Sequence, residues 1–202
     1  MKRIIFATGN RDKLKEIREI AAKFGFEVVS MKDAGYELEI EENGTTFAEN
    51  ALIKARAICL ASHEITMADD SGIIIDAMNG EPGVQSARFM GRDTSYRIKN
   101  AAIIRNLDGV PDEKRSARYV CAIATVFPDG RTLECEDTFE GRIAYEEAGS
   151  NGFGYDPIFY VPEFGKTAAQ MTPEEKNAVS HRGKALRKME TMLQELSDRG
   201  EL

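Results

Sequence analysis

Arg3-Ile4-Ile5-Phe6-Ala7 opens the chain as a short apolar run, and Phe26-Glu27-Val28-Val29-Ser30 repeats this pattern after an amphipathic segment. Both runs are typical of buried strands. Between them, Asp12 to Phe24 carries apolar side chains at helical spacing, and Gly25 follows as a helix stop. This β-α-β order favours a parallel pair of strands with a right-handed crossover, which predicts an α/β fold.

The loop between the first strand and the first helix is Thr8-Gly9-Asn10, with Lys13 one turn further on. Such a loop favours an anion, because backbone N–H groups and the helix dipole point toward it. The side chains of Asn10 and Lys13 add donors. A plain strand–helix connection with a solvated lysine explains the same residues, so both interpretations stay open. The loop is not a Walker A motif, and Gly165-Lys166-Thr167 is not one either, because Tyr160 stands where the first glycine should be.

An acidic motif, Ala68-Asp69-Asp70-Ser71-Gly72, lies between the β-type runs Ile65-Thr66-Met67 and Ile73-Ile74-Ile75. We expect it where a strand ends and the chain turns, a position that suits exposed chemistry. Two carboxylates beside a hydroxyl fit a Mg²⁺ site, because this hard cation takes oxygen ligands and keeps several waters. A polar β-turn made of the usual turn residues is the alternative.

The segment before this motif is strongly acidic from Glu37 to Gly44. It predicts either an edge strand, a solvated acidic loop, or a carboxylate supplied to a metal at Asp70. Thr46-Phe47-Ala48-Glu49 then matches a capping box, which predicts a helix to about Ala61. Asn50 and Lys54 are four residues apart on one side of this helix, near its amino end.

A predicted helix from Thr94 to Leu107 leads into a region of different pattern. Tyr119 to Phe127 and Thr132 to Phe139 flank a Pro-Asp-Gly turn and predict a β-hairpin. Together with Gly141 to Tyr145, the hairpin would make an antiparallel, extended region distinct from the opening of the chain. We expect a second lobe here rather than a separate domain, because no linker composition precedes it.

The loop from Gly149 to Pro157 places three glycines around two aromatic residues and an aspartate. Glycine allows close approach of a ligand, and an aromatic ring there can stack on a base; a flexible loop with one buried aromatic is the alternative. Pro157 to Val161 predicts a strand, and Thr172-Pro173-Glu174-Glu175 predicts a short capped helix. The last helix begins at Ser180-His181-Arg182-Gly183, where cations are disfavoured, which suggests either a ligand partner or a surface pair.

Composition narrows the class of protein. The 202 residues suit one domain with two lobes, and 42% hydrophobic with 30% charged residues predicts a packed core. A net charge of −7 argues against a nucleic-acid polymer but not against a mononucleotide. The three cysteines form no C-x-x-C pair, so we expect reduced thiols in a cytoplasmic protein. The longest apolar run is far too short to cross a membrane.

Six motifs occur in an order that resembles one family almost from end to end, the Ham1-type inosine triphosphate pyrophosphatases, also called dITP/XTP pyrophosphatases. The motifs are Thr8-Gly9-Asn10-x-x-Lys13, Thr46-Phe47-x-Glu49-Asn50-Ala51-x-x-Lys54-Ala55, Ala68-Asp69-Asp70-Ser71-Gly72, Pro82-Gly83-x-x-Ser86-Ala87-Arg88, Phe153-Gly154-Tyr155-Asp156-Pro157 and Ser180-His181-Arg182. The resemblance implies an elongated mixed sheet in a single domain spanning residues 1–202, with two α/β lobes and a cleft between them. It also implies a homodimer.

The implied reaction is Mg²⁺-dependent hydrolysis of non-standard purine nucleoside triphosphates (ITP, dITP, XTP, dXTP) to the monophosphate and pyrophosphate, which cleanses the nucleotide pool. Asp70 would be the general base and a metal ligand, and Glu41 a second ligand; Glu42 is adjacent, so this assignment can be off by one. Ser71 would touch the substrate. The triphosphate would be held by Thr8, Gly9, Asn10, Arg11, Asp12 and Lys13. The base would be held and read by Phe153, Gly154, Tyr155, Asp156, Lys176, His181 and Arg182.

The chemistry of the reaction agrees with these roles. Attack by water on a triphosphate needs neutralised charge, which Lys13, Lys54 and a metal ion would supply. Arg88 can reach a phosphate or form a structural ion pair. A carbonyl at position 6 of the base would accept hydrogen bonds from Lys176 or the His181–Arg182 turn, and adenine would leave those donors unpaired.

Two other functions remain open. A non-catalytic nucleotide sensor would use the same loops, although a binder gains little from acids beside phosphates. A Maf-type pyrophosphatase would act on pyrimidine nucleotides, but we expect it to lack the Phe-Gly-Tyr-Asp and Ser-His-Arg motifs.

Overall fold

The computed structural model describes residues 2–21 and 26–201, and these divide into two compact units. Unit 1 contains residues 1–70, 121–137 and 182–202, and unit 2 contains residues 71–120 and 138–181. The predicted helix residue Phe24 and the helix stop Gly25 lie outside the described residues. In the part of the chain that is described, no helix is long and apolar enough to cross a membrane.

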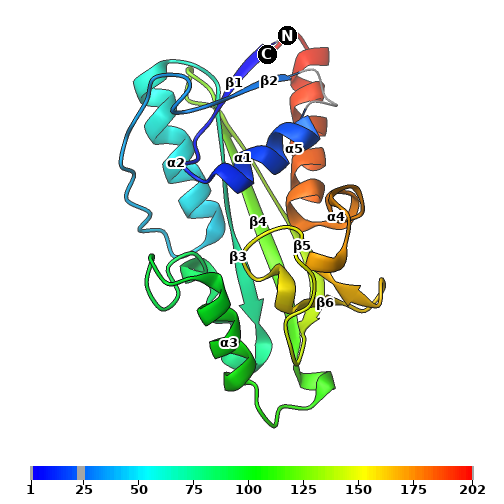
Figure 1. The fold of residues 1–202 in the computed structure, drawn as a ribbon. Coiled ribbons are helices and arrows are strands. Elements are labelled where there is room, and N and C mark those ends of the chain that lie inside the picture. Colours follow the sequence, from blue (N-terminus) through cyan, green and yellow to red (C-terminus); the bar gives the residue numbers. More distant parts are fainter. Residues whose placement is uncertain (1, 22–25, 202) are drawn as a thin grey trace. The chain divides into compact units, whose positions relative to one another are not determined.

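The opening of the chain forms the predicted β-α-β unit in unit 1 (Figure 1). Strand β1 (Lys2–Phe6), helix α1 (Arg11–Ala21) and strand β2 (Phe26–Ser30) follow in order. β1 and β2 are parallel, with Ile4 opposite Val28, and β1 is also parallel to β3 (Thr66–Ile75). The prediction of a parallel pair is therefore confirmed.

Seven strands form one sheet in the order β2-β1-β3-β4-β5-β6-β7. The later strands are β4 (Ser116–Val126), β5 (Thr132–Ile143), β6 (Phe159–Val161) and β7 (Lys166–Thr167). The β5-β6 and β6-β7 pairs are antiparallel, so the sheet is mixed, as predicted. The β4-β5 connection closes with the Phe127 N–H donating to the Arg131 carbonyl, as expected for the predicted hairpin.

The helices agree with the predicted ones to within two residues at most termini. Helix α2 spans Phe47–Ser62 behind a complete Thr46–Glu49 capping box, and α4 spans Pro173–Val179 behind a second one at Thr172. The remaining helices are α3 (Tyr96–Asn106) and α5 (His181–Asp198). Short 3₁₀ turns occupy Asp76–Met78, Gly83–Gln85, Asp112–Lys114, Asp156–Ile158 and Ala168–Gln170.

Some strand predictions are wrong. The extended region predicted to include Gly141 to Tyr145 stops at Ile143, where β5 ends. The strand expected from Pro157 begins only at Phe159, because residues 156–158 form a 3₁₀ turn that accommodates the proline. Residues 37–44 form no strand. This acidic segment is a loop, which was one of the expected alternatives.

The largest correction concerns the acidic motif. We expected Asp69 and Asp70 at a strand end, but β3 runs without a break from Thr66 to Ile75 and contains both in its middle. Asp69 is 1% exposed and Asp70 is 8% exposed. A strand tolerates buried carboxylates only when they are paired or hydrogen-bonded, so their partners, described below, explain how the strand continues.

Each unit has its own hydrophobic core. In unit 1, Ile4 and Phe6 of β1 pack with Ile17 of α1 and with Leu186 and Met189 of α5. In unit 2, the core gathers residues from β3, α3, β4, β5 and β6, including Ile73, Ile103, Tyr119, Phe139 and Phe159. These two cores hold the strands and helices that carry the predicted site residues.

Candidate active site

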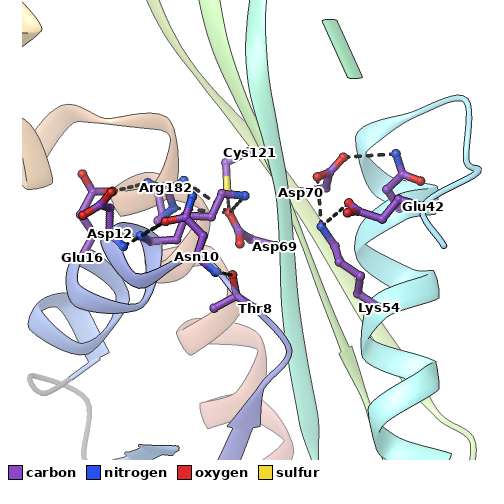
Figure 2. A network of polar contacts seen from close by, with 12 residues as sticks. Thr8, Asn10, Asp12, Glu16, Glu42, Lys54, Asp69, Asp70, Cys121 and Arg182 are labelled. Atoms are coloured by element: carbon purple, nitrogen blue, oxygen red, sulfur yellow. Dashed lines mark hydrogen bonds and ion pairs between the residues drawn. The ribbon is translucent and has the colours of Figure 1, made fainter. Parts of the chain in front are cut away.

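The alternation of β3 sends its two carboxylates in opposite directions. Successive side chains of a strand point to opposite faces, and Figure 2 shows Asp69 and Asp70 on either side of the ribbon. Asp69 faces α1 and the amino end of α5, whereas Asp70 faces α2 and the acidic loop before it. The Asp-Asp pair of the motif therefore forms two different environments within unit 1.

Asp70 is held from α2 by two side chains one helical turn apart. Lys54 Nζ lies 3.0 Å from Asp70 Oδ1, and Asn50 Nδ2 lies 3.3 Å from Asp70 Oδ2. The capping box at Thr46 fixes where α2 begins, and residues four apart share a helix face. Both oxygens of Asp70 are thereby oriented by the same helix.

The acidic loop reaches this carboxylate through Glu42. Lys54 Nζ lies 2.8 Å from Glu42 Oε2, so one ammonium bridges Glu42 and Asp70. Asn50 Oδ1 also accepts a 2.8 Å hydrogen bond from the Gly44 N–H, which ties the loop to α2. Glu41, the predicted ligand, is exposed, and the structure brings its neighbour Glu42 to Asp70 instead.

The electrostatics of this group suit a base that is protonated and deprotonated during a reaction. Burial raises the pKa of Asp70 above its ordinary value, although the Lys54 ammonium opposes the shift. Burial disfavours the charged form of Lys54, but the carboxylates of Asp70, Asp69 and Glu42 outweigh it and raise the pKa of Lys54. Lys54 therefore remains a cation beside Asp70.

The same oxygens fit a divalent cation. Lys54 Nζ already occupies a position between carboxylate oxygens of Glu42 and Asp70, which shows that a positive charge is accommodated there. In the described chain, no group of three or more His, Cys, Asp or Glu side chains could hold a metal ion. A cation at this place would thus complete its shell with water and substrate oxygens, which is the habit of Mg²⁺.

Asp69 is the centre of a buried ion cluster on the other side of β3. Its Oδ2 lies 3.1 Å from Lys13 Nζ and 3.4 Å from Arg182 Nε, and Cys121 Sγ is 3.9 Å away. Arg182 also pairs with Glu16 of α1. Burial alone would raise the pKa of Asp69, but Lys13, Arg182 and Lys54 lower it far below its ordinary value. Asp69 is therefore a permanent anion.

This cluster explains why a cation is tolerated in the first turn of α5. Arg182 is 2% exposed, and the carboxylates of Glu16 and Asp69 raise its pKa despite burial. The sequence suggested either a ligand or a surface pair for this residue. The structure instead places the arginine in the interior and supplies its counter-charges from α1 and β3.

The loop before α1 is organised by its own side chains. Thr8 Oγ1 accepts a hydrogen bond from the Asn10 N–H (3.2 Å), and Asn10 Oδ1 accepts hydrogen bonds from the N–H groups of Asp12 (2.9 Å) and Lys13 (3.2 Å). Two of the amides on which the anion prediction depends are therefore taken up by Asn10, which caps the helix. Lys13, in the first turn of α1, contributes its ammonium group to the ion cluster around Asp69.

Unit 2 contains a second buried polar group, centred on Asp156. Its Oδ2 accepts hydrogen bonds from Lys176 Nζ (2.7 Å) and from the Phe153 N–H (3.0 Å), and its Oδ1 accepts one from the Tyr119 hydroxyl (3.2 Å). His181 stacks on the Tyr119 ring with a centroid distance of 4.8 Å and an interplanar angle of 9°. The structure thus brings Phe153, Asp156, Lys176 and His181 together.

The rest of the glycine-rich loop is fixed by packing. The Tyr155 hydroxyl donates to the Ser86 carbonyl at 2.6 Å, and its ring packs edge-on against Tyr96. Asn100 Nδ2 donates to the Gly154 carbonyl at 3.3 Å. Tyr155 is only 3% exposed, whereas Phe153 is half-buried. Of the two aromatics in the motif, Phe153 is therefore the more exposed ring, and Lys176 Nζ lies over it at 5.3 Å from its centroid.

Several of these residues escaped prediction. Asp69 was predicted only as one of two possible Mg²⁺ ligands in the acidic motif, and its ion cluster was not foreseen. Asn50 had no assigned role, and Glu42 was only the neighbour of the predicted ligand. Tyr119 and Asn100 belong to a strand and a helix that read as ordinary core, so no sequence pattern marks them. Only spatial proximity identifies the two, since they lie far from their partners along the chain.

A first prediction concerns Gly152. Its φ is +71°, and a Cβ there would overlap Asp156 Oδ2 and lie 3.4 Å from Lys176 Nζ. Gly109 has a similar φ of +73°, but a Cβ there would meet nothing within 4 Å, so Gly109→Ala is a matched control. Both variants should lose about 1 kcal/mol of stability from backbone strain. Only Gly152→Ala should also raise the KM for nucleotide, about tenfold; equal KM values in the two variants would contradict the assignment of Asp156 to binding.

Comparison with known proteins points to one family. The model of the Ham1 family matches residues 4–192. A dITP/XTP pyrophosphatase of Geobacillus kaustophilus is 46% identical over 196 residues, which cover 97% of this chain and 96% of that protein. One from Listeria monocytogenes serotype 4b is 44% identical over 199 residues, 98% of each chain. The solved structure of a HAM1 protein from Coxiella burnetii has a TM-score of 0.87 at 41% identity, and covers 96% of this chain and 100% of that one.

Proposed function

This chain belongs to the Ham1 family, and from that premise we propose that it hydrolyses non-standard purine nucleoside triphosphates to the monophosphate and pyrophosphate. The substrates would be ITP, dITP, XTP and dXTP. The observation that carries the proposal is the partly buried Glu42–Lys54–Asp70 group, in which helix α2 supplies the cation and holds a carboxylate with a raised pKa. A protein that only binds nucleotides has no need of such a base.

In the proposed reaction, Asp70 accepts the proton of the water that attacks phosphorus. A base with a raised pKa is better matched to neutral pH than an ordinary aspartate. Lys54 offsets the negative charge of the phosphates on the Asp70 side of β3, and Asn50 keeps the carboxylate of Asp70 oriented. A Mg²⁺ ion held by Asp70 and by Glu42 would polarise the water and the phosphate oxygens. Ser71 follows Asp70 in β3 and would contact the substrate.

Selection of the base is assigned to the polar group of unit 2. Lys176 and His181 are the donors that would meet a carbonyl at position 6 of the purine, and Phe153 would pack on the ring. Adenine presents an amino donor at that position, so the hydrogen bonds that these side chains would donate to the carbonyl of the base would be lost. Each such mismatch costs about 1–3 kcal/mol, and a few together give strong discrimination.

A panel of nucleotides tests the proposal. Pyrophosphate release should be fast from ITP and XTP, at least about a hundredfold slower from ATP and dTTP, and abolished when EDTA removes the divalent cation. Binding of ITP with no pyrophosphate release would support a sensor instead. Faster release from dTTP than from ITP would support a Maf-type enzyme. Magnesium itself is tested by restoring activity with Mg²⁺ after EDTA treatment.

The assembly and location belong to the same proposal. We infer a homodimer in the cytoplasm from the resemblance to the family. Light scattering coupled to gel filtration measures the mass of the native protein, which should be about twice the 22.4 kDa of one chain. A mass that stays at one chain over the working concentration range would contradict the dimer without affecting the proposed reaction.

A further inference from the structure

Tyr119 of β4 contacts two residues that the proposed function assigns to base recognition. Its side chain is buried in unit 2, with 7% exposed. Its hydroxyl lies 3.2 Å from Asp156 Oδ1, and its ring stacks nearly parallel on His181. Phe159 packs against the Tyr119 ring at a centroid distance of 4.6 Å. The tyrosine is thus fixed by its neighbours and makes both contacts from one rigid position.

We propose that Tyr119 is a positioning residue for base recognition, which acts through its hydroxyl on Asp156 and through its ring on His181. The inference rests on the proposed function and deepens it. Tyr119 itself does not need to touch the nucleotide, because Asp156 and His181 transmit its effect. No sequence motif contains this residue, and its role follows only from the contacts in unit 2.

The hydroxyl matters because Asp156 is a shared acceptor. Oδ2 is occupied by Lys176 Nζ and the Phe153 N–H, so Tyr119 supplies the donor to Oδ1. With donors on both oxygens, the carboxylate cannot rotate without breaking a hydrogen bond in a buried place, which is costly. The orientation of Asp156 in turn sets the position of the Lys176 ammonium. Burial and the Asp156 carboxylate raise the pKa of Tyr119, so the phenol stays a donor at all working pH values.

The ring matters because His181 begins α5 and needs a defined orientation to present a donor. Stacking at a centroid distance of 4.8 Å holds the imidazole nearly parallel to the tyrosine ring. Phe159 buttresses the Tyr119 ring within the core, and the Phe139 ring packs on Phe159 with a centroid distance of 5.2 Å. The imidazole therefore rests on a platform that belongs to the sheet rather than to a loop.

Two variants separate the two contacts. Tyr119→Phe removes the hydroxyl and keeps the ring, and Tyr119→Leu removes both. Tyr160→Phe is the control, since it removes a hydroxyl from a half-buried tyrosine of β6 that packs with Arg142. For Tyr119→Phe we expect the KM for ITP to rise about tenfold with kcat within about twofold, and the preference for ITP over ATP to fall about fivefold. Tyr160→Phe should change neither the KM for ITP nor the preference for ITP over ATP.

A double-mutant cycle identifies the route of the effect. If the hydroxyl acts through Asp156, then Tyr119→Phe should have little further effect on KM in an Asp156→Asn background. A general loss of packing would instead add to the Asp156→Asn effect in full. Additive effects would therefore overturn the proposal, as would wild-type KM and selectivity in Tyr119→Phe.

The ring contact has a spectroscopic readout that does not depend on activity. The chain contains two histidines, and a His63→Asn variant assigns their proton NMR signals. The His181 ring protons should be shifted upfield by the stacked ring in the wild type and in Tyr119→Phe, and should lose this shift in Tyr119→Leu. An unchanged His181 signal in Tyr119→Leu would overturn the platform role. Failure of the wild type to hydrolyse ITP would refute the proposed function instead, and the NMR result would be unaffected by it.

Discussion

Asp70→Asn should lose about a thousandfold in kcat while the protein keeps its fold. The expected loss follows from removal of a general base, which contributes about 10²–10⁴ in rate. The fold should persist because burial raises the pKa of Asp70, so an uncharged side chain of the same shape is easier to bury than the carboxylate. Asn50 and Glu42 keep their contacts with Gly44 and Lys54. Steady-state kinetics with ITP and thermal unfolding measure the two quantities.

The control for this variant is an exposed aspartate of the same unit. Asp129 lies in the turn after β4 and pairs with Arg131 at the surface. Asp129→Asn removes the same charge and should keep turnover unchanged. If Asp70→Asn retained more than about a tenth of wild-type kcat, the assignment of the base would be wrong. A large fall in melting temperature would instead mean that the carboxylate is mainly structural.

Asp69→Asn should show the opposite behaviour, with a loss of about 3 kcal/mol in the free energy of unfolding. Removal of one partner of a buried ion pair leaves an uncompensated charge, which costs about 3–5 kcal/mol. Here Lys13 and Arg182 lose their common acceptor, although Arg182 keeps Glu16. For a domain of this size the melting temperature should fall by about 10 °C. Asp129→Asn should leave it unchanged, because exposed ion pairs contribute little.

The pH dependence of this stability has a defined sign. The folded protein holds the pKa of Asp69 below its ordinary value of 3.8, so the ion cluster stabilises the fold at every pH above that value. Its contribution begins to decrease as the pH falls below 3.8 and is fully lost only at the much lower pKa of the folded state. In denaturant unfolding, the difference between wild type and Asp69→Asn should therefore be largest and constant well above pH 4, and should shrink progressively as the pH falls below about 4. If the difference in unfolding free energy between wild type and Asp69→Asn stayed constant down to about pH 3, the ion cluster would not be the cause of that difference.

The architecture was predictable where a local pattern had one interpretation. Apolar runs and helical spacing gave the β-α-β opening, and Thr46 and Thr172 marked two helix starts through their capping boxes. The acidic motif misled for a physical reason. Asp and Ser are typical turn residues, so a local pattern predicts a turn. The two aspartates can be buried within a strand because cations from distant segments pair with them. These cations are Lys13, Lys54 and Arg182.

The candidate site was predictable where a motif carried its own chemistry. Asp70 and Lys54 were identified from residue type and spacing, and the structure places them in contact. The choice between Glu41 and Glu42 depends on how an irregular loop follows the surface of α2, which no periodicity encodes. Tyr119 lies 37 residues from Asp156 along the chain. Contacts between residues so far apart in the sequence depend on how the whole sheet is assembled. The sequence around Tyr119 therefore predicts only a residue of a core strand.

The unbroken course of β3 has a consequence for how the motif can change. Neighbouring side chains in an extended segment point to opposite faces, so in the proposed function Asp69 stabilises the fold while Asp70 takes part in turnover. Inserting or deleting one residue upstream in β3 would move each side chain to the opposite face of the sheet. Asp69 would then face α2, and Asp70 would face α1 and α5. Variation in this protein should therefore alter the identity of residues along β3 far more readily than their number.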